Sequence, residues 1–169
     1  RSHVTEVELL QDYLQSHSLE EHGEKLSEKM KKKLPVIYTS QRYKPVAYRW
    51  RTQFNENTKI LSIHHALPEA NHNEILGYQG LEAETHTFLI TMDDDHNRVK
   101  KRFTETKKTI RKQGQTASEI RFKGKRLVKL FSAINLGDWT SYYAALQRNT
   151  DPSPITEIET FKENMGKFV

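Results

Sequence analysis

From Leu34 onward, short apolar runs alternate with longer segments of helical periodicity, and this alternation restricts the possible folds more than any other feature. Short apolar runs between helical segments are typical of buried strands, and their alternation with helices predicts βαβ units. We therefore expect an α/β fold, a three-layer αβα sandwich of the flavodoxin type around a parallel sheet of about four to five strands. The expected strands are 34–38, 59–63, 87–92 and 118–122, and the expected helices are 44–57, 72–78, 97–112, 125–147 and 155–165.

The first 33 residues differ from the rest of the chain. Residues 4–15 and 20–33 predict two polar helices with thin apolar stripes, which are typical of a connector or an outer-layer element rather than of a core. Residues 1–3 lack the apolar segment of a secretion signal and resemble a cloning remnant. We therefore divide the chain into a helical extension, 1–33, and a domain, 34–169.

Several classes of site are excluded by what the sequence lacks. A chain without Cys has no disulfide framework, no thiolate zinc site, no iron–sulfur cluster and no cysteine nucleophile. The glycine-rich nucleotide loops and the GxSxG and HExxH motifs are also missing, and we expect no cofactor. No apolar run approaches the roughly 20 residues of a membrane-spanning helix. We expect a cytoplasmic protein without a membrane partner.

The positive charge is concentrated in one stretch of the chain. Thirteen of the 27 basic residues lie between Arg98 and Lys129, against only Glu105 and Glu119. Such a segment either forms a solvated helix face or attracts phosphate esters or nucleic acid. Because aromatic side chains are not interleaved with these charges in the way that stacking platforms require, we disfavour a nucleic-acid partner. A phosphorylated small molecule remains compatible with the charge.

The polar segments that follow the expected strands are the places to search for a site. In parallel α/β sheets, ligands bind at the carboxyl ends of strands, beside helix N-termini. Glu74 and His96 fall in such segments, but a lone carboxylate there is commonly a partner of the helix dipole. Taken alone, the residues indicate an α/β domain that binds an anionic ligand. The segments are 39–44, 64–74 and 93–98.

Three histidines lie close together in the second of these segments, at His64, His65 and His72. A zinc site requires regularly spaced ligands and supporting groups around them. This spacing shows neither feature. We therefore expect ordinary polar loop histidines and no bound metal.

Several stretches, taken together and in order, resemble one family. The likeness covers roughly residues 34–165 and is to the C-terminal sugar isomerase (SIS) domain of the bifunctional phosphoglucose/phosphomannose isomerases. This resemblance implies a SIS-like form of the expected fold and makes residues 1–33 an interdomain connector. The stretches are Pro35-Val36-Ile37-Tyr38, residues 46–57, Asn71-His72-Asn73-Glu74-Ile75, residues 136–143, Asp151-Pro152-Ser153-Pro154 and Phe161-Lys162.

The resemblance implies isomerisation of glucose 6-phosphate or mannose 6-phosphate with fructose 6-phosphate, by ring opening and proton transfer through a cis-enediol(ate). It assigns the base to Glu74, because such a reaction needs an ionised carboxylate that can take and return a proton. It assigns ring opening to His96, although Asn97 replaces the family's usual proline, and a substrate-facing role to Lys162. Lys162 could instead serve only to cap the last helix. His96 is expected to reach a site across a two-fold dimer.

The chain departs from the family in length, because such enzymes carry two tandem SIS domains. The N-terminal domain supplies a phosphate-binding Ser/Thr loop, and residues 39–41 are too few to replace it. We therefore expect the isolated domain to be weakly active or inactive, and to act with an N-terminal SIS domain of the same parent chain. The alternative is a non-catalytic SIS module that binds a phosphosugar or dimerises.

Overall fold

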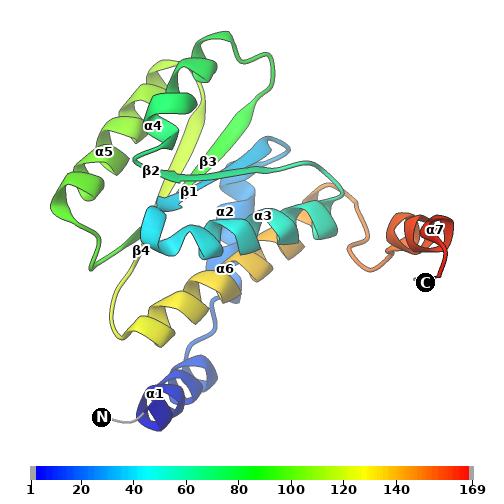
Figure 1. Cartoon of the computed structure of the whole chain (residues 1–169), viewed down its shortest axis with the longest axis horizontal. Helices are drawn as coiled ribbons and strands as arrows, with labels where there is room; N and C mark the ends of the chain where they lie inside the picture. Colours follow the sequence, from blue (N-terminus) through cyan, green and yellow to red (C-terminus); the bar gives the residue numbers. More distant parts are fainter. Residues whose placement is uncertain (1–2, 168–169) are drawn as a thin grey trace.

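The computed structural model describes residues 3–167, which form a parallel four-stranded sheet between two layers of helices (Figure 1). The strand order is β2-β1-β3-β4, and every neighbouring pair is parallel. This arrangement confirms the predicted α/β class and the parallel sheet. The strands are β1 (Leu34–Ser40), β2 (Ile63–Leu67), β3 (Thr85–Met92) and β4 (Thr116–Phe122).

Each face of the sheet is covered by its own group of helices (Figure 1). One face packs against α2 (Glu20–Met30), α3 (Lys44–Thr58) and α6 (Arg126–Gln147), and a short turn, η1 (Gln41–Tyr43), leads into α3. The other face packs against α4 (Ala70–Asn73), η2 (Ile75–Gly80) and α5 (Asn97–Lys112). Two helices lie at the ends of the chain, α1 (His3–Ser16) and α7 (Thr156–Met165).

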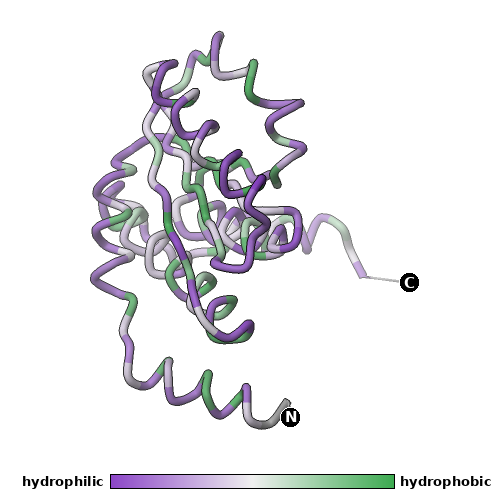
Figure 2. The backbone as a smooth tube through the Cα atoms, turned by 90° about the vertical axis from the view of Figure 1, so that its left-hand side faces the viewer, coloured by the Kyte–Doolittle hydropathy of each residue, from purple (hydrophilic) through white to green (hydrophobic). Residues whose placement is uncertain are grey.

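The outer segments and the interior differ in hydropathy. Figure 2 shows hydrophilic stretches along the outermost helices and hydrophobic stretches in the interior. Helix α1 lies beside α6, whereas α7 buries none of its residues and projects from the body (Figure 1). Within residues 3–167, no helix is both long and apolar enough to cross a membrane.

The core is divided between the two faces because successive side chains of a strand point in opposite directions. Ile37, Phe88 and Ile90 face α3 and α6, whereas Val36 and Tyr38 face α5 and η2. Strands covered on both faces read as continuous apolar runs. This explains why β1 and β3 could be identified from the sequence.

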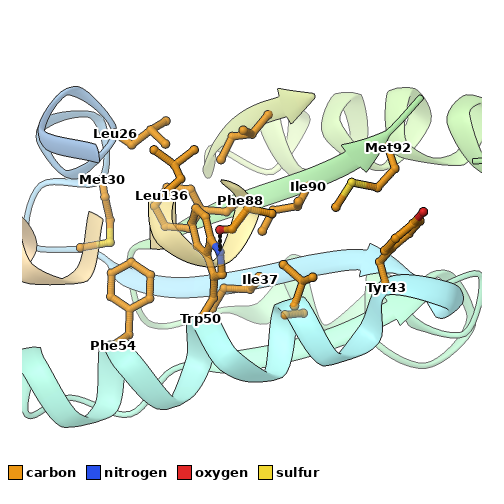
Figure 3. Close-up of a cluster of buried hydrophobic side chains, with 14 of the residues drawn as sticks. Leu26, Met30, Ile37, Tyr43, Trp50, Phe54, Phe88, Ile90, Met92 and Leu136 are labelled. Carbon is orange, nitrogen blue, oxygen red and sulfur yellow. Dashed lines mark hydrogen bonds between the residues drawn. The ribbon is translucent and has the colours of Figure 1, made fainter. Parts of the chain in front are cut away.

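Trp50 connects α3 to α6 across the first of these core layers (Figure 3). Its side chain is fully buried, and its indole N–H donates a hydrogen bond of 2.7 Å to the Ala133 carbonyl. The ring lies against Gly137, where an added Cβ would come within 2.4 Å of the indole nitrogen. Gly137 therefore allows the close approach of the two helices.

We expect Gly137→Ala to lower the free energy of unfolding by about 1–3 kcal/mol, because the new methyl group overpacks a core with no room to expand. Gly77→Ala is the matched control, since no heavy atom lies within 4 Å of its added Cβ. Urea unfolding of both variants measures the difference. Equal stability of the two variants would contradict the packing described for Trp50.

The second strand lies further along the chain than predicted. Helix α3 continues to Thr58, and the chain then turns through Lys59, whose φ of 57° is left-handed. Leu61, which was expected in the strand, is 79% exposed. The strand begins at Ile63 because residues 63–67 pair with β1. The prediction of a strand at 59–63 is therefore wrong, and His64 and His65 are strand residues rather than loop histidines.

Two further local predictions need correction. The predicted helix 72–78 is a single α-helical turn, α4, which begins at Ala70 and is followed by the η2 turn. Helix α2 belongs to the layer that covers the sheet, because Leu26 and Met30 are buried in the core (Figure 3). Helix α2 is therefore part of the core layer and not a peripheral element. The domain boundary at residue 34 stays a prediction.

Candidate active site

Glu74 lies at the junction of α4 and η2, above the face of the sheet. The chain leaves β2 through a cis peptide bond between Leu67 and Pro68, makes the single turn of α4, and ends that turn at Glu74. The Glu74 N–H donates to the Ala70 carbonyl at 3.0 Å. Its carboxylate turns towards β1 and β2 rather than lying beyond the strand ends.

A buried chain of hydroxyl groups ends on the Glu74 carboxylate. Tyr38 donates to Glu74 Oε2 at 2.6 Å, Tyr78 donates to the Tyr38 hydroxyl at 3.2 Å, and Thr87 Oγ1 lies 3.1 Å from the Tyr78 hydroxyl. Burial, together with Tyr78 and Glu74, raises the pKa of Tyr38, so its phenol stays protonated. The chain therefore holds one carboxylate oxygen in a fixed position as a hydrogen-bond acceptor.

His65 faces the other carboxylate oxygen. It is paired in register with Tyr38 on the neighbouring strand, so the two side chains lie next to each other on one face of the sheet. Its Nδ1 lies 3.7 Å from Glu74 Oε1, too far for a hydrogen bond, and has no hydrogen-bond partner among the described residues. Glu74 thus lies between a phenol donor and an imidazole.

The carboxylate opens into a cavity of about 380 Å³ beside the edge strand β2. The side chain of Glu74 is 31% exposed and is therefore accessible to a ligand, although the Tyr38 hydroxyl holds its Oε2 on the side of the sheet. A cavity of this size accommodates a sugar-sized ligand. The lining residues come from β1, β2, β3 and the α4–η2 segment and are Val36, Tyr38, Ile63, Asn73, Glu74, Gly77, Tyr78, Leu81 and Thr85.

The other two expected site residues lie elsewhere in the chain. His96 follows β3 and caps α5, where its Nδ1 accepts a hydrogen bond of 3.2 Å from the Arg98 N–H, and its side chain is exposed. Lys162 is exposed on α7. Within residues 3–167, no hydrogen bond or ion pair joins Glu74, His96 and Lys162, so these side chains have no such direct contact with one another in one copy of the chain.

A charged cluster occupies the carboxyl ends of β1, β3 and β4. Lys129 is 3% exposed and its ammonium lies 2.8 Å from Asp93 and 2.5 Å from Asp94. Burial alone would lower the pKa of Lys129, but the hydrogen bonds with both aspartates outweigh it and raise that pKa. The hydrogen bond from Lys129, followed by that from the Gly124 N–H, lowers the pKa of Asp93 to about 2.

The charges of this cluster neutralise one another, because the guanidinium of Arg42 also pairs with Asp94. The hydroxyl of Tyr43 donates a further hydrogen bond to Asp94. It stabilises the end of the sheet next to His96. Within the described part of the chain, no group of three or more His, Asp or Glu side chains could hold a metal ion.

The groups that hold Glu74 are not evident from the sequence alone. The sequence pattern predicts Tyr38 only as a strand residue and Tyr78 only as the end of a short helix. The one available signal for Tyr38 was a phenol inside a buried strand, which usually has a hydrogen-bond partner. Its partner lies 36 positions away and emerges only from the fold.

Solved structures contain the same arrangement of a parallel sheet between two layers of helices. The fold matches a glucose-6-phosphate isomerase-like protein from Thermus thermophilus with a TM-score of 0.64 and 20% identity, over 83% of this chain and 46% of that one. It also matches the C-terminal domain of glucosamine-fructose-6-phosphate aminotransferase from Francisella tularensis with a TM-score of 0.59 and 13% identity, over 80% of this chain and 42% of that one. The chain therefore shares the fold of these two proteins.

Sequence comparison identifies the family within this class. Residues 19–165 match the family described as bacterial phospho-glucose isomerase C-terminal SIS domain, and the chain belongs to it. It is 35% identical over 136 residues, or 80% of its length, to the bifunctional phosphoglucose/phosphomannose isomerase of Thermoplasma acidophilum. It is 32% identical over 153 residues, or 89% of its length, to that of Aquifex aeolicus. The chain spans only 43% and 48% of these two relatives.

Proposed function

We propose that this domain supplies the proton-transferring carboxylate of a cytoplasmic glucose-6-phosphate/mannose-6-phosphate isomerase. The observation that carries the proposal is the position of Glu74, fixed by Tyr38 at 2.6 Å and open to a cavity of about 380 Å³. The bifunctional isomerases to which the chain is similar give the reaction class.

In the proposed reaction, the Glu74 carboxylate takes a proton from C1 of open-chain fructose 6-phosphate and returns it to C2. The electron pair of the broken C–H bond forms the C1=C2 double bond of a cis-enediol(ate), and the negative charge develops on the C2 oxygen. The hydroxyl proton of O1 passes to O2, and protonation of C2 then leaves the aldehyde at C1. The Tyr38 hydroxyl holds Glu74 Oε2, so Oε1 is the oxygen free to approach the substrate. A base held within reach of a carbon acid contributes about 10²–10⁴-fold to the rate.

The separation of Glu74, His96 and Lys162 in one chain supports a site assembled from more than one unit. We propose that His96 opens the sugar ring in the site of a second copy, and that Lys162 faces the substrate when α7 packs against a neighbouring unit. An N-terminal SIS domain of the same parent chain would bind the substrate phosphate. Losing those contacts removes binding energy that positions the reacting carbons.

The test is a coupled assay that converts fructose 6-phosphate to glucose 6-phosphate, with mannose 6-phosphate as the second substrate. We expect the 169-residue chain to be weakly active or inactive, and a chain that joins it to an N-terminal SIS domain of the family to turn over. Absence of turnover in the joined, folded and dimeric protein would contradict the proposal.

The lack of contact among Glu74, His96 and Lys162 in one chain also favours a second candidate function, a non-catalytic module that binds a phosphosugar or dimerises. This candidate predicts that the joined protein binds fructose 6-phosphate without converting it. The same assay, combined with a binding measurement, therefore separates the two functions.

A further prediction concerns the residue that holds Glu74. We expect Tyr38→Phe to lower kcat of the joined protein by roughly 10- to 150-fold with KM nearly unchanged, because a lost hydrogen bond to a charged group corresponds to about 1.5–3 kcal/mol. Tyr43→Phe, which removes a phenol bound to Asp94 instead, serves as the control. A change confined to KM would assign Tyr38 to substrate binding rather than to positioning of the base.

A further inference from the structure

A second cavity, of about 360 Å³, lies between the α4–η2 segment and α5. We call it the α5 groove, and it is lined by Asn71 and Ile75 on one side and by Arg98, Lys101, Arg102, Glu105, Thr106 and Thr109 of α5 on the other. It is distinct from the Glu74 cavity, since the two share no lining residue.

The α5 groove carries positive charge that the protein does not neutralise. Arg98, Lys101 and Arg102 follow the i, i+3, i+4 spacing of one helix face. Within residues 3–167, the side chains of Arg98 and Lys101 make no hydrogen bond or ion pair, and Arg102 makes only a long contact of 3.5 Å with Asn71 Oδ1. The groove's one carboxylate, Glu105, is paired with Lys108 at 2.9 Å.

Polar groups at the floor of the groove are fixed in place. Asn71 Nδ2 donates to Thr106 Oγ1 at 2.6 Å, and Thr106 is only 2% exposed. The amide oxygen of Asn71 in turn faces Arg102. Three cations of α5 therefore line one side of a groove whose floor is held by hydrogen bonds, which differs from cations spread over a convex solvated face.

We propose that the α5 groove is a binding site for a phosphomonoester, separate from the proposed isomerase site. Guanidinium groups bind phosphate oxygens in a bidentate manner, and a lysine adds a point charge. A volume of about 360 Å³ exceeds that of a phosphate ion and fits a phosphorylated metabolite of sugar size. None of the residues that line the groove is aromatic, so stacked nucleic-acid bases lack a platform there.

The ligand would also contact the segment that carries Glu74, because Asn71 and Ile75 of the α5 groove flank it in sequence. The site nevertheless does not depend on the proposed reaction. Its evidence is the charge and shape of the groove, and its test needs no turnover.

The experiment titrates the folded 169-residue chain with inorganic phosphate and with glucose 6-phosphate, followed by amide NMR, with glucose as the uncharged reference. We expect the largest shifts at Asn71, Lys101 and Thr106 for both anions and none there for glucose. Tighter binding of glucose 6-phosphate identifies a sugar phosphate as the ligand, and equal affinities identify the phosphate group alone; both support the site.

The variant Arg98→Gln/Lys101→Gln should weaken phosphate binding at least tenfold. The matched control is Lys112→Gln/Lys123→Gln, which removes two charges outside the groove and should leave the affinity within twofold. Equal weakening in the two double variants would show diffuse attraction and overturn the proposal, as would shifts confined to the Glu74 cavity. Glu74→Gln should bind phosphate in the α5 groove unchanged, which separates this outcome from failure of the isomerase assignment.

Discussion

Glu74→Gln, introduced into a chain that joins this domain to an N-terminal SIS domain, should lower kcat for fructose 6-phosphate by about 10²–10⁴-fold. The amide has nearly the size of the carboxylate and can still accept the hydrogen bond of 2.6 Å from Tyr38. It cannot take a proton from carbon. We therefore expect the fold and KM to change little, and a coupled assay measures the loss in kcat.

The matched control is Glu69→Gln, which lies at the start of the same helical turn. Glu69 is exposed, and its Oε1 accepts from Asn73 Nδ2 at 2.8 Å, an interaction that glutamine can keep. We expect its kcat to stay within about twofold of the unmodified protein. A similar loss in both variants would mean that α4 is disturbed as a whole and that no specific role belongs to Glu74.

The second large effect concerns stability and originates at His86. This side chain is 2% exposed in β3, where its two ring nitrogens contact the Thr116 hydroxyl at 2.9 Å and the Ser118 hydroxyl at 3.0 Å. Burial, followed by the nearby charges of Lys33, Lys29 and Arg111, lowers the pKa of His86 to about 4. The folded protein therefore holds a neutral imidazole that the unfolded chain protonates near pH 6.5.

Because the unfolded state binds the extra proton, the contribution of His86 is fully present above pH 6.5 and is lost as the pH falls towards 4. The difference between a pKa of 6.5 in the unfolded chain and about 4 in the folded protein corresponds to about 3 kcal/mol of unfolding free energy. Urea unfolding from pH 7 to pH 4 should show this loss relative to His86→Gln, which has no such proton to bind. His72→Gln, at an exposed position, should follow the unmodified protein. Parallel pH curves for all three proteins would refute the assignment.

The elements predicted well from the sequence are those in which local pattern and tertiary environment agree. Strands β1 and β3 are buried on both faces and read as continuous apolar runs. Helices α5 and α6 have long periodic stripes, and their observed bounds lie within a residue of the predicted ones. Strand β2 was misplaced because its sequence contains two histidines, while the apolar residues just before it are in an exposed turn. Only pairing with β1 defines its position.

The candidate site was predictable in part. The resemblance to the family points to Glu74, and the structure places that residue at a cavity, as an acid–base role requires. The groups around it could not be predicted, because Tyr38, which binds Glu74, and His65, which faces it, are brought next to each other only by the parallel pairing of β1 with β2. The roles proposed for His96 and Lys162 stay predictions, because no contact within one chain tests them.

The most direct test of the account is hydrogen exchange at carbon. The joined protein is incubated with fructose 6-phosphate in ²H₂O, and NMR follows deuterium at C1 of the ketose and at C2 of the glucose 6-phosphate formed. We predict incorporation by the unmodified protein and loss of incorporation together with turnover in Glu74→Gln. Incorporation by folded Glu74→Gln at the unmodified rate would contradict the account, because another group would then be moving the proton.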